Sequence, residues 1–207
     1  MTLHLGITGR MGSGKSFVCR IFEETFNIPV FYSDKEAKKC YDLPDVKQEV
    51  CRLFGPEVLL GDGSFDWQAI GQIVFQDNDK LQRLNAIIHP RVMENYQAWK
   101  LKQASPYTLF ESAILFEQHL TPLFDAVIYI QCPVEIIMQR VRLRNGWDRQ
   151  TVEQRLRQQQ FQEDCSRQAD YLILHDSQAS LAEGRRKLLP QVQHIHEQLL
   201  VISSSGQ

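Results

Sequence analysis

The sequence lacks the features that mark secreted or membrane-spanning proteins. It holds only five cysteines in 207 residues, widely spaced and without a C-x-x-C pair. This pattern argues against a disulfide framework or a zinc site and favours small buried or incidental thiols in a reducing compartment. No apolar run approaches the length of a membrane span, and the first residues lack the basic segment of a signal peptide. We therefore expect a cytoplasmic protein with no membrane partner.

The sequence also carries almost no excess charge. Its 23 lysines and arginines stand against 25 aspartates and glutamates, for a net charge of -2. We therefore expect no nucleic-acid partner, although a local basic groove stays open, and the sequence predicts nothing about protein partners. Neither an internal repeat nor a low-complexity segment occurs. A composition of 43% apolar and 23% charged residues fits one α/β domain with sizeable insertions.

The most informative stretch is residues 9–16, Gly-Arg-Met-Gly-Ser-Gly-Lys-Ser. This is the G-x-x-x-x-G-K-S pattern of a phosphate-binding loop, and it stands between an apolar strand over residues 3–8 and a segment with helical spacing. Its glycines allow a tight turn that brings backbone N–H groups close to an anion at a helix N-terminus. The alternative, a glycine-rich turn that happens to hold a lysine, does not explain these flanks. We therefore predict that the chain binds a nucleoside triphosphate with Mg²⁺.

The residue types within the loop suggest individual contacts. Lys15 is expected to reach the β- and γ-phosphates, and the Ser16 hydroxyl is expected to take one position on Mg²⁺. The residues predicted to hold the nucleotide are Gly12, Ser13, Gly14, Lys15, Ser16 and Phe17.

Asp34 follows a short apolar strand over residues 30–32. Ligands of an open α/β sheet bind at the carboxyl ends of its strands, so this carboxylate is expected near the transferred phosphate. There it could orient and deprotonate an attacking hydroxyl. The alternative is a helix N-cap, because Asp is a preferred cap and a helical segment follows. The two roles are compatible, and position alone does not separate them.

Residues 35–104 are predicted to be mostly helical and to form an insertion over the substrate side of the sheet. Gly55 and Pro56 should end one helix, and His89 and Pro90 should break another. The expected N-caps in this region are Asp66 and either Asp77 or Asn78.

A predicted strand over residues 107–110 ends in Glu111. An acid after an apolar strand in a phosphate-loop protein is a candidate to hold Mg²⁺ through water, although strands that end in an acid are common. Residues 114–117 are expected to form a short packing helix in which Glu117 is solvated or binds a cap.

The last third of the chain is predicted to hold strands over residues 126–130 and 171–174 and a final helix over about 181–200. The tail, residues 203–207, is expected to fray. Between the two strands, residues 140–157 are rich in arginine. They form either a solvated helical face with charge pairs or a lid whose arginines close over the phosphates. Their late position favours the lid for Arg140 and Arg144, with the other arginines at the surface.

Together these residues resemble the dephospho-coenzyme A kinase family over nearly the whole chain. Many families share the phosphate loop, but residues 84–90, Leu-Asn-Ala-Ile-Ile-His-Pro, are similar to this family's more specific Asn-Ala-Leu-Leu-His-Pro block. Residues 114–117 resemble its Leu-Leu-Phe-Glu segment, and Ser33-Asp34 stands where it has Asp-Ala-Asp. Its lid and last-strand pattern is followed at Arg140, Arg144, Arg155, Gln159 and residues 169–173.

The resemblance implies an α/β fold, a P-loop three-layer sandwich with a parallel five-stranded sheet, a helical substrate-binding insertion and a helical lid. The core would comprise about 1–34, 105–140 and 168–200, the coenzyme region about 35–104, and the lid about 141–167. The implied reaction uses ATP and Mg²⁺ to phosphorylate the ribose 3′-hydroxyl of dephospho-coenzyme A, the last step of coenzyme A synthesis.

The resemblance also implies roles for single residues. Asp34 aligns with the family's proposed base, which favours that role over a cap alone. His89 aligns with a substrate-region histidine, the alternative being that it fixes the helix break before Pro90. The implied catalytic residues are Lys15, Asp34 and Arg140; the further nucleotide contact is Arg144; the substrate contacts are Asp34, His89 and Glu117; and Mg²⁺ is held by Ser16, with Glu111 acting through water.

The sequence departs from the family pattern at several of these places. Arg10 replaces the usual glycine beside the phosphates, and Tyr32 replaces the first Asp of the triplet. The remaining departures are Lys38 for Arg, Glu111 for Asp, Ala113 for Pro, Cys165 for a basic residue and His175 for Asn. They indicate a divergent member and bear on substrate contacts more than on the reaction.

Two other functions fit parts of the sequence. One is a different small-metabolite or nucleotide kinase of the same fold, because the chemistry barely changes with the acceptor. The other is a nucleotide-dependent switch or ATPase that acts on a protein partner. Against the switch, the sequence has no Asn-Lys-x-Asp guanine-reading segment and no long partner-binding extension.

Overall fold

The computed structural model describes residues 2–159, 162–177 and 180–205. The chain falls into two compact units. The first combines Met1–Tyr32 with Gln103–Gln207, and the second is Ser33–Lys102. In the described part of the chain, no helix combines the length and the apolar character that crossing a membrane would need.

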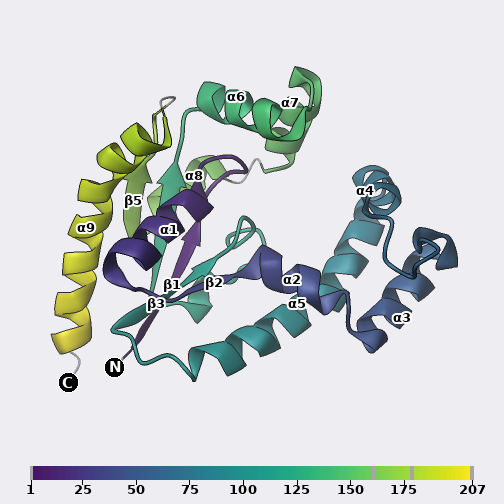
Figure 1. Cartoon of the computed structure of the whole chain (residues 1–207), viewed down its shortest axis with the longest axis horizontal. Coiled ribbons are helices and arrows are strands. Elements are labelled where there is room, and N and C mark those ends of the chain that lie inside the picture. Colours follow the sequence, from purple (N-terminus) through teal and green to yellow (C-terminus); the bar gives the residue numbers. More distant parts are fainter. Residues whose placement is uncertain (1, 160–161, 178–179, 206–207) are drawn as a thin grey trace. The chain divides into compact units, whose positions relative to one another are not determined.

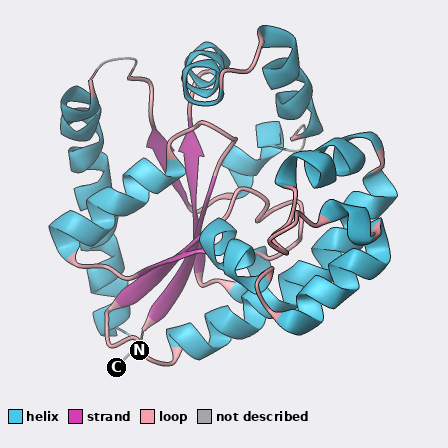
Figure 2. Cartoon of the chain, turned by 45° about the vertical axis from the view of Figure 1, so that its right-hand side comes forward, coloured by secondary structure: helices cyan, strands magenta, loops and turns pink. Residues whose placement is uncertain are grey.

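The first unit is built on a five-stranded sheet. Its strands are β1 (Leu3–Thr8), β2 (Val30–Tyr32), β3 (Tyr107–Glu111), β4 (Ala126–Gln131) and β5 (Tyr171–Leu174). Their order across the sheet is β2-β3-β1-β4-β5, and every neighbouring pair is parallel. Figure 2 shows the strands fanning out, as the right-handed twist of strands requires. The predicted parallel five-stranded sheet is confirmed, and all five carboxyl ends lie at one edge.

Helices α1 (Lys15–Phe26) and α9 (Leu181–Ser205) cover one face of this sheet (Figure 1). Side chains alternate along a strand, so Ile128 and Ile130 of β4 join the core beneath these helices while Tyr129 faces the other way. The helices that follow β4 are α6 (Val134–Asn145), α7 (Arg149–Gln158) and α8 (Gln162–Gln168), and the turn η2 (Thr121–Leu123) precedes β4.

The second unit is helical, as the sequence predicts. Its helices are α2 (Ser33–Cys40), α3 (Pro44–Phe54), η1 (Pro56–Val58), α4 (Trp67–Gln76) and α5 (Asn78–Lys100). Both predicted aspartate caps form. Asp66 accepts from the N–H groups of Gln68 and Ala69, and Asp77 accepts from the N–H of Lys80. These bonds satisfy backbone donors that no helical carbonyl reaches.

The predicted helix break at His89-Pro90 is wrong. Helix α5 runs unbroken through Pro90 from Asn78 to Lys100. Proline removes one backbone donor and clashes with the preceding turn. However, buried apolar residues continue at four-residue spacing on both sides of it, which keeps one face of the helix packed. These residues are Leu84, Ile88, Val92 and Tyr96.

Two smaller expectations are also wrong. Residues 114–117 form a hydrogen-bonded turn and no helix, with His119 at a φ of 50° just beyond. The tail does not fray at Ser203. Helix α9 continues to Ser205, and the hydroxyl groups of the three serines donate to carbonyl oxygens three or four residues earlier. Gly206 and Gln207 lie outside the described residues.

The packing of α9 on the sheet makes a testable prediction. Leu188 is 1% exposed in the core under this helix, whereas Leu181 at its start is 75% exposed. We expect Leu188→Ala to lower the free energy of unfolding by about 2–5 kcal/mol, because it leaves a cavity in a packed core. Leu181→Ala, the control on the same helix, should change it by less than about 0.5 kcal/mol. Urea denaturation checks both, and equal effects would contradict the assigned packing.

Candidate functional site

The phosphate loop connects β1 to α1. Three of its glycines have positive φ, with values of 149° at Gly9, 77° at Gly12 and 98° at Gly14. A Cβ at Gly9 would meet the carbonyl oxygen of Ile130, and a Cβ at Gly14 would collide with the ring of His175. The path of the loop therefore requires glycine for both conformation and space.

Lys15, the first residue of α1, bonds two backbone carbonyl groups of the phosphate loop. Its Nζ donates to the carbonyl oxygens of Gly9 at 3.0 Å and Arg10 at 3.3 Å, and the side chain is 7% exposed. The Arg10 carbonyl also accepts from the N–H of Ser13 at 3.0 Å. These bonds hold the ammonium group at the N-terminus of α1, where its charge adds to the helix dipole in favour of an anion.

Arg140 of α6 bonds the loop carbonyls further along. Its Nη1 donates to the carbonyl oxygens of Gly12 at 3.4 Å and Ser13 at 3.2 Å. Its Nη2 donates to the carbonyl oxygen of Ser177 at 2.7 Å and lies 2.8 Å from Nε2 of His175. The structure thus brings Arg140 to the loop. Its bonds are to backbone carbonyls, a histidine and the Cys132 thiol, and a contact with phosphate stays a prediction.

His175 follows β5 directly and is 5% exposed. Its ring stacks on Phe17 with 5.8 Å between the centroids, and its Nδ1 lies 2.8 Å from the carbonyl oxygen of Ser13. Burial first, and then the neighbouring Arg140 guanidinium, lower the pKa of His175 below its ordinary value of 6.5. The imidazole is therefore neutral at pH 7.

Gln159 joins the predicted lid segment to the loop. This residue is the C-cap of α7, and its Oε1 accepts a hydrogen bond from the N–H of Met11 at 3.0 Å. In the same helix, the guanidinium of Arg155 lies over the ring of Trp147 at 4.2 Å from its centroid, a cation–π contact. The predicted lid segment, 141–167, therefore contacts the phosphate loop through Gln159.

Two buried hydroxyl groups in and beside the loop have no hydrogen-bond partner among the described residues. They are Oγ1 of Thr8 and Oγ of Ser13. Proteins rarely leave a buried polar atom unpaired. Together with the glycine turns and the N-terminus of α1, these donors fit a phosphate group, whose oxygens accept hydrogen bonds.

Ser16 and Glu111 supply oxygens of the kind that Mg²⁺ prefers. Ser16 Oγ lies 3.5 Å from Oε1 of Glu111, a residue that ends β3 and is 4% exposed. No group of three or more His, Cys, Asp or Glu side chains that could hold a metal by itself occurs in the described part of the chain. A magnesium ion at this pair would therefore complete its shell with oxygens from the nucleotide and from water.

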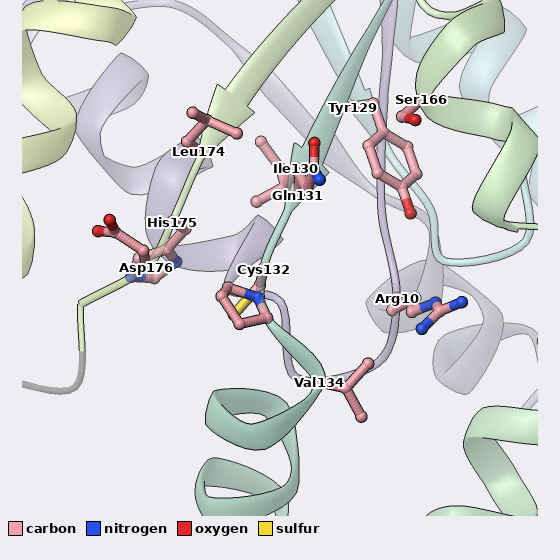
Figure 3. A pocket seen from close by; sticks show the side chains of 11 residues that line it. Arg10, Tyr129, Ile130, Gln131, Cys132, Val134, Ser166, Leu174, His175 and Asp176 are labelled. Carbon is pink, nitrogen blue, oxygen red and sulfur yellow. The ribbon is translucent and has the colours of Figure 1, made fainter.

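A cavity of about 380 Å³ opens at the carboxyl ends of β4 and β5 (Figure 3). Arg10 and Tyr129 lie on one side of β4, while His175 and Asp176 follow β5. Burial raises the pKa of Tyr129 to about 12, although the nearby Arg10 charge acts in the opposite direction. Arg10, the departure from the family pattern that stands in the phosphate loop, thus lines this cavity.

Two other predicted residues of the first unit are Arg144 and Glu117. Arg144 is exposed on α6, one turn beyond Arg140, and its Nε donates to the side chain of Asn145 at 2.8 Å. Glu117 is half-buried in the turn after β3, where its charge contributes to the raised pKa of Tyr129. The charge of Glu117 therefore acts on Tyr129 of β4, whereas Arg144 lies on the surface.

The two remaining predicted residues belong to the second unit. Asp34 is exposed and is the second residue of α2, because the helix already begins at Ser33. The alternative that Asp34 is the N-cap is therefore wrong, although a carboxylate in the first turn still suits the helix dipole. His89 is half-buried within α5 and does not fix a helix break, since none occurs. Their roles toward substrate stay predictions.

Comparison with known proteins identifies the family. A family model described as dephospho-CoA kinase matches residues 3–181. The chain belongs to the dephospho-CoA kinase family. The dephospho-CoA kinase of Bacteroides fragilis is 32% identical over 194 residues, which cover 93% of this chain and 90% of that protein. The dephospho-CoA kinase of Porphyromonas gingivalis is 35% identical over 173 residues, with 83% and 85% covered.

A solved structure gives the same result for the fold. A Thermus thermophilus protein superposes with a TM-score of 0.79 at 28% identity, covering 94% of this chain and 97% of that one. The family and the P-loop kinase fold predicted from the sequence are therefore confirmed, and the chain is a kinase of the dephospho-CoA kinase family. Use of ATP follows from the kinase family and the phosphate loop together.

Sequence reasoning did not assign a site role to His175 or Gln159. His175 was visible only as a departure from the family pattern, and Gln159 only as part of the lid pattern. One signal could have found His175. It follows the carboxyl end of a strand, and the strand-end rule that selects Asp34 selects it equally.

Proposed function

We propose that this protein transfers the γ-phosphoryl group of ATP to the ribose 3′-hydroxyl of dephospho-coenzyme A, giving coenzyme A and ADP. The observation that carries the proposal is a phosphate loop with complete glycine geometry, a buried lysine and unpaired hydroxyls in a chain of this family. In the reaction the acceptor oxygen bonds to the γ-phosphorus, and the bond from that phosphorus to the bridging oxygen breaks.

The loop residues bind and orient the triphosphate in this proposal. The backbone N–H groups of Gly12 and Gly14 and the unpaired hydroxyl of Ser13 surround the phosphates at the N-terminus of α1, and Lys15 neutralises charge on the β- and γ-phosphates. Phe17, one turn into the helix, stacks on His175 and packs beside this region. Such preorganised charge and donors lower the barrier, because they need little rearrangement as the phosphoryl group moves.

Ser16 and Glu111 would hold Mg²⁺ in this proposal, Ser16 directly and Glu111 through water. A bound magnesium ion supplies neutralisation of the phosphate oxygens and fixes their orientation. The adjacency of the two side chains, 3.5 Å between Oγ and Oε1, supports this assignment.

Asp34 is proposed to accept the proton of the acceptor hydroxyl. It follows the last residue of β2 by two positions, and β2 ends at the same sheet edge as the strand that enters the phosphate loop. The second unit, with His89, is proposed to bind the coenzyme, together with Glu117. Arg140 and Arg144 are proposed to act on the phosphates when the segment 141–167 closes and excludes water.

The choice of acceptor separates this function from its two alternatives. With saturating ATP and Mg²⁺, dephospho-coenzyme A is expected to stimulate ADP release, measured by a coupled assay, well above the rate without an acceptor. Other small alcohols, nucleosides and nucleotides should give little stimulation. Clear turnover with one of them, and none with dephospho-coenzyme A, would favour another kinase activity. Hydrolysis that responds only to an added protein would favour the switch.

The base assignment is tested by Asp34→Asn. This change keeps the size of the side chain and removes its basicity, so kcat should fall about 10²- to 10⁴-fold while ATP affinity is retained. Asp42→Asn, at another exposed aspartate of the second unit, is the control and should leave kcat unchanged. Steady-state kinetics give kcat, and calorimetry gives the affinity. Near-normal turnover of Asp34→Asn would rule out the base role.

The magnesium assignment is tested by titrating Mg²⁺ at fixed ATP. Ser16→Ala should raise the Mg²⁺ concentration for half-maximal rate by about tenfold or more, because one ligand is lost. Ser16→Thr keeps the hydroxyl and should recover most of the effect, while Glu111→Gln should also raise the requirement. If Ser16→Ala and Glu111→Gln both titrate like the unmodified protein, the pair does not hold the metal.

A further inference from the structure

His175 connects three parts of the first unit around the phosphate loop. Its Nδ1 lies 2.8 Å from the Ser13 carbonyl oxygen, and its Nε2 lies 2.8 Å from Nη2 of Arg140. The ring also occupies the space that a side chain at Gly14 would need, and it stacks on Phe17. A buried titratable group therefore sits directly behind the residues proposed to bind phosphate.

The two shortest contacts, each 2.8 Å, assign the tautomer of this ring, although Nη1 of Arg140 also lies 3.3 Å from Nδ1. The Ser13 carbonyl can only accept, and the guanidinium of Arg140 can only donate. The ring must therefore carry its proton on Nδ1 and offer a lone pair at Nε2. The other neutral tautomer would oppose two acceptors at Ser13 and two donors at Arg140. Only the neutral Nδ1–H form satisfies the two 2.8 Å contacts together.

We propose that His175 is a positioning residue for nucleotide binding. In its neutral form it holds the Ser13 carbonyl and the Arg140 guanidinium together, and this fixes the direction of the loop amides that receive the phosphates. Arg140 itself bonds to the carbonyls of Gly12 and Ser13, so a shift of either partner moves the loop. The inference rests on the proposed function, since it concerns how the same site binds ATP.

Protonation of His175 breaks this arrangement. A proton on Nε2 would place two donors and two positive charges 2.8 Å apart, so the bond to Arg140 could not persist. Among the elements packed against the ring, α6 contributes Arg140, and the chain after β5 contributes Asp176. Asp176 favours the protonated ring, but it lies 3.9 Å from Nζ of Lys187 on α9, which offsets its charge.

Arg140 is the main charged group that acts on the protonation of His175. The Cys132 thiol lies 3.5 Å from Nη1 of Arg140, and burial raises its pKa, so it is neutral. Helix α1 presents the uncharged Phe17, and α9 presents Gly184. No carboxylate therefore bonds directly to the ring among the described residues, and the neutral imidazole is the favoured form at pH 7.

The sign of the pH dependence follows. The pKa of His175 is lower in the folded chain than its ordinary 6.5, so the unfolded chain binds more protons. The contribution of this network is complete above about pH 6.5 and is lost as the pH falls through the lower pKa of the folded state. Nucleotide affinity should fall with acidity below the pKa of His175 in the folded chain, because only the neutral ring bonds to both Ser13 and Arg140.

The test measures the Kd of ATP at saturating Mg²⁺ by calorimetry between pH 8 and pH 5. Three proteins are compared: the unmodified chain, His175→Phe and His175→Asn. Phenylalanine keeps the buried ring and its stacking but neither hydrogen bond, so ATP should bind about tenfold more weakly at pH 8. Asparagine offers one donor and one acceptor that do not titrate, so it should recover most of that loss.

The decisive readout is the slope of affinity with pH. Below the pKa of His175 in the folded chain, the Kd of the unmodified protein should rise by up to an additional factor of about ten per pH unit compared with that of His175→Asn. The slope of His175→Asn reports all other titrating groups, ATP included. Equal slopes for these two proteins, or a Kd for His175→Phe equal to that of the unmodified protein at pH 8, would overturn the inference. Thermal melts at each pH confirm that the proteins compared are folded.

The same experiment separates this inference from the proposed function. If the unmodified protein binds no ATP at pH 8, the proposed function fails and the positioning role fails with it. If ATP binds and dephospho-coenzyme A is phosphorylated but the pH slopes coincide, only the role of His175 is lost.

Discussion

A loop can offer its amides to an anion only if its carbonyl groups are bonded elsewhere. In this chain three side chains meet that requirement: Lys15 of the loop motif itself, and Arg140 and His175 from distant places in the sequence. Lys15 takes the carbonyls of Gly9 and Arg10, while Arg140 and His175 share that of Ser13. With these oxygens held, loop N–H groups can point toward an anion, apart from that of Ser13, which donates to the Arg10 carbonyl. The sheet positions both distant residues. Strand β5 ends at Leu174, directly before His175, and β4 leads into α6, which carries Arg140.

The sequence predicts the parts of this structure that depend on local chemistry. Strand–loop–helix order, aspartate caps at Asp66 and Asp77, and the parallel sheet all follow from spacing and residue type, with the strand count implied by the family resemblance. Prediction fails where packing decides. Pro90 should break a helix on local grounds, yet α5 continues because buried residues on both sides share one face. At residues 114–117 the error is the opposite one: the short apolar run predicts a helix, but the structure has a turn.

The candidate site divides in the same way. Residues 9–16 are recognisable from their motif, and Glu111 is recognisable because it ends a predicted strand. The contacts of Arg140 and His175 with the loop are not recognisable in this way, because these residues lie 128 and 162 positions beyond the loop carbonyls that they bond. No pattern within a window of sequence reports such pairs. They become visible only when parallel strands bring their carboxyl ends to one edge, which a sequence predicts as a rule but not as a set of partners.

The departures from the family pattern have physical consequences where the structure describes their contacts. Tyr32 donates to Glu23 at 2.5 Å, and burial followed by this bond raises the tyrosine pKa, so it remains a neutral donor. His175 stands where the family pattern has Asn, and either side chain can present one donor and one acceptor. The exchange therefore preserves a donor and an acceptor for Ser13 and Arg140 while adding a titratable group, whose pKa burial and Arg140 hold below 6.5. An asparagine would hold the loop equally at every pH, whereas a histidine makes the conformation of the loop depend on pH.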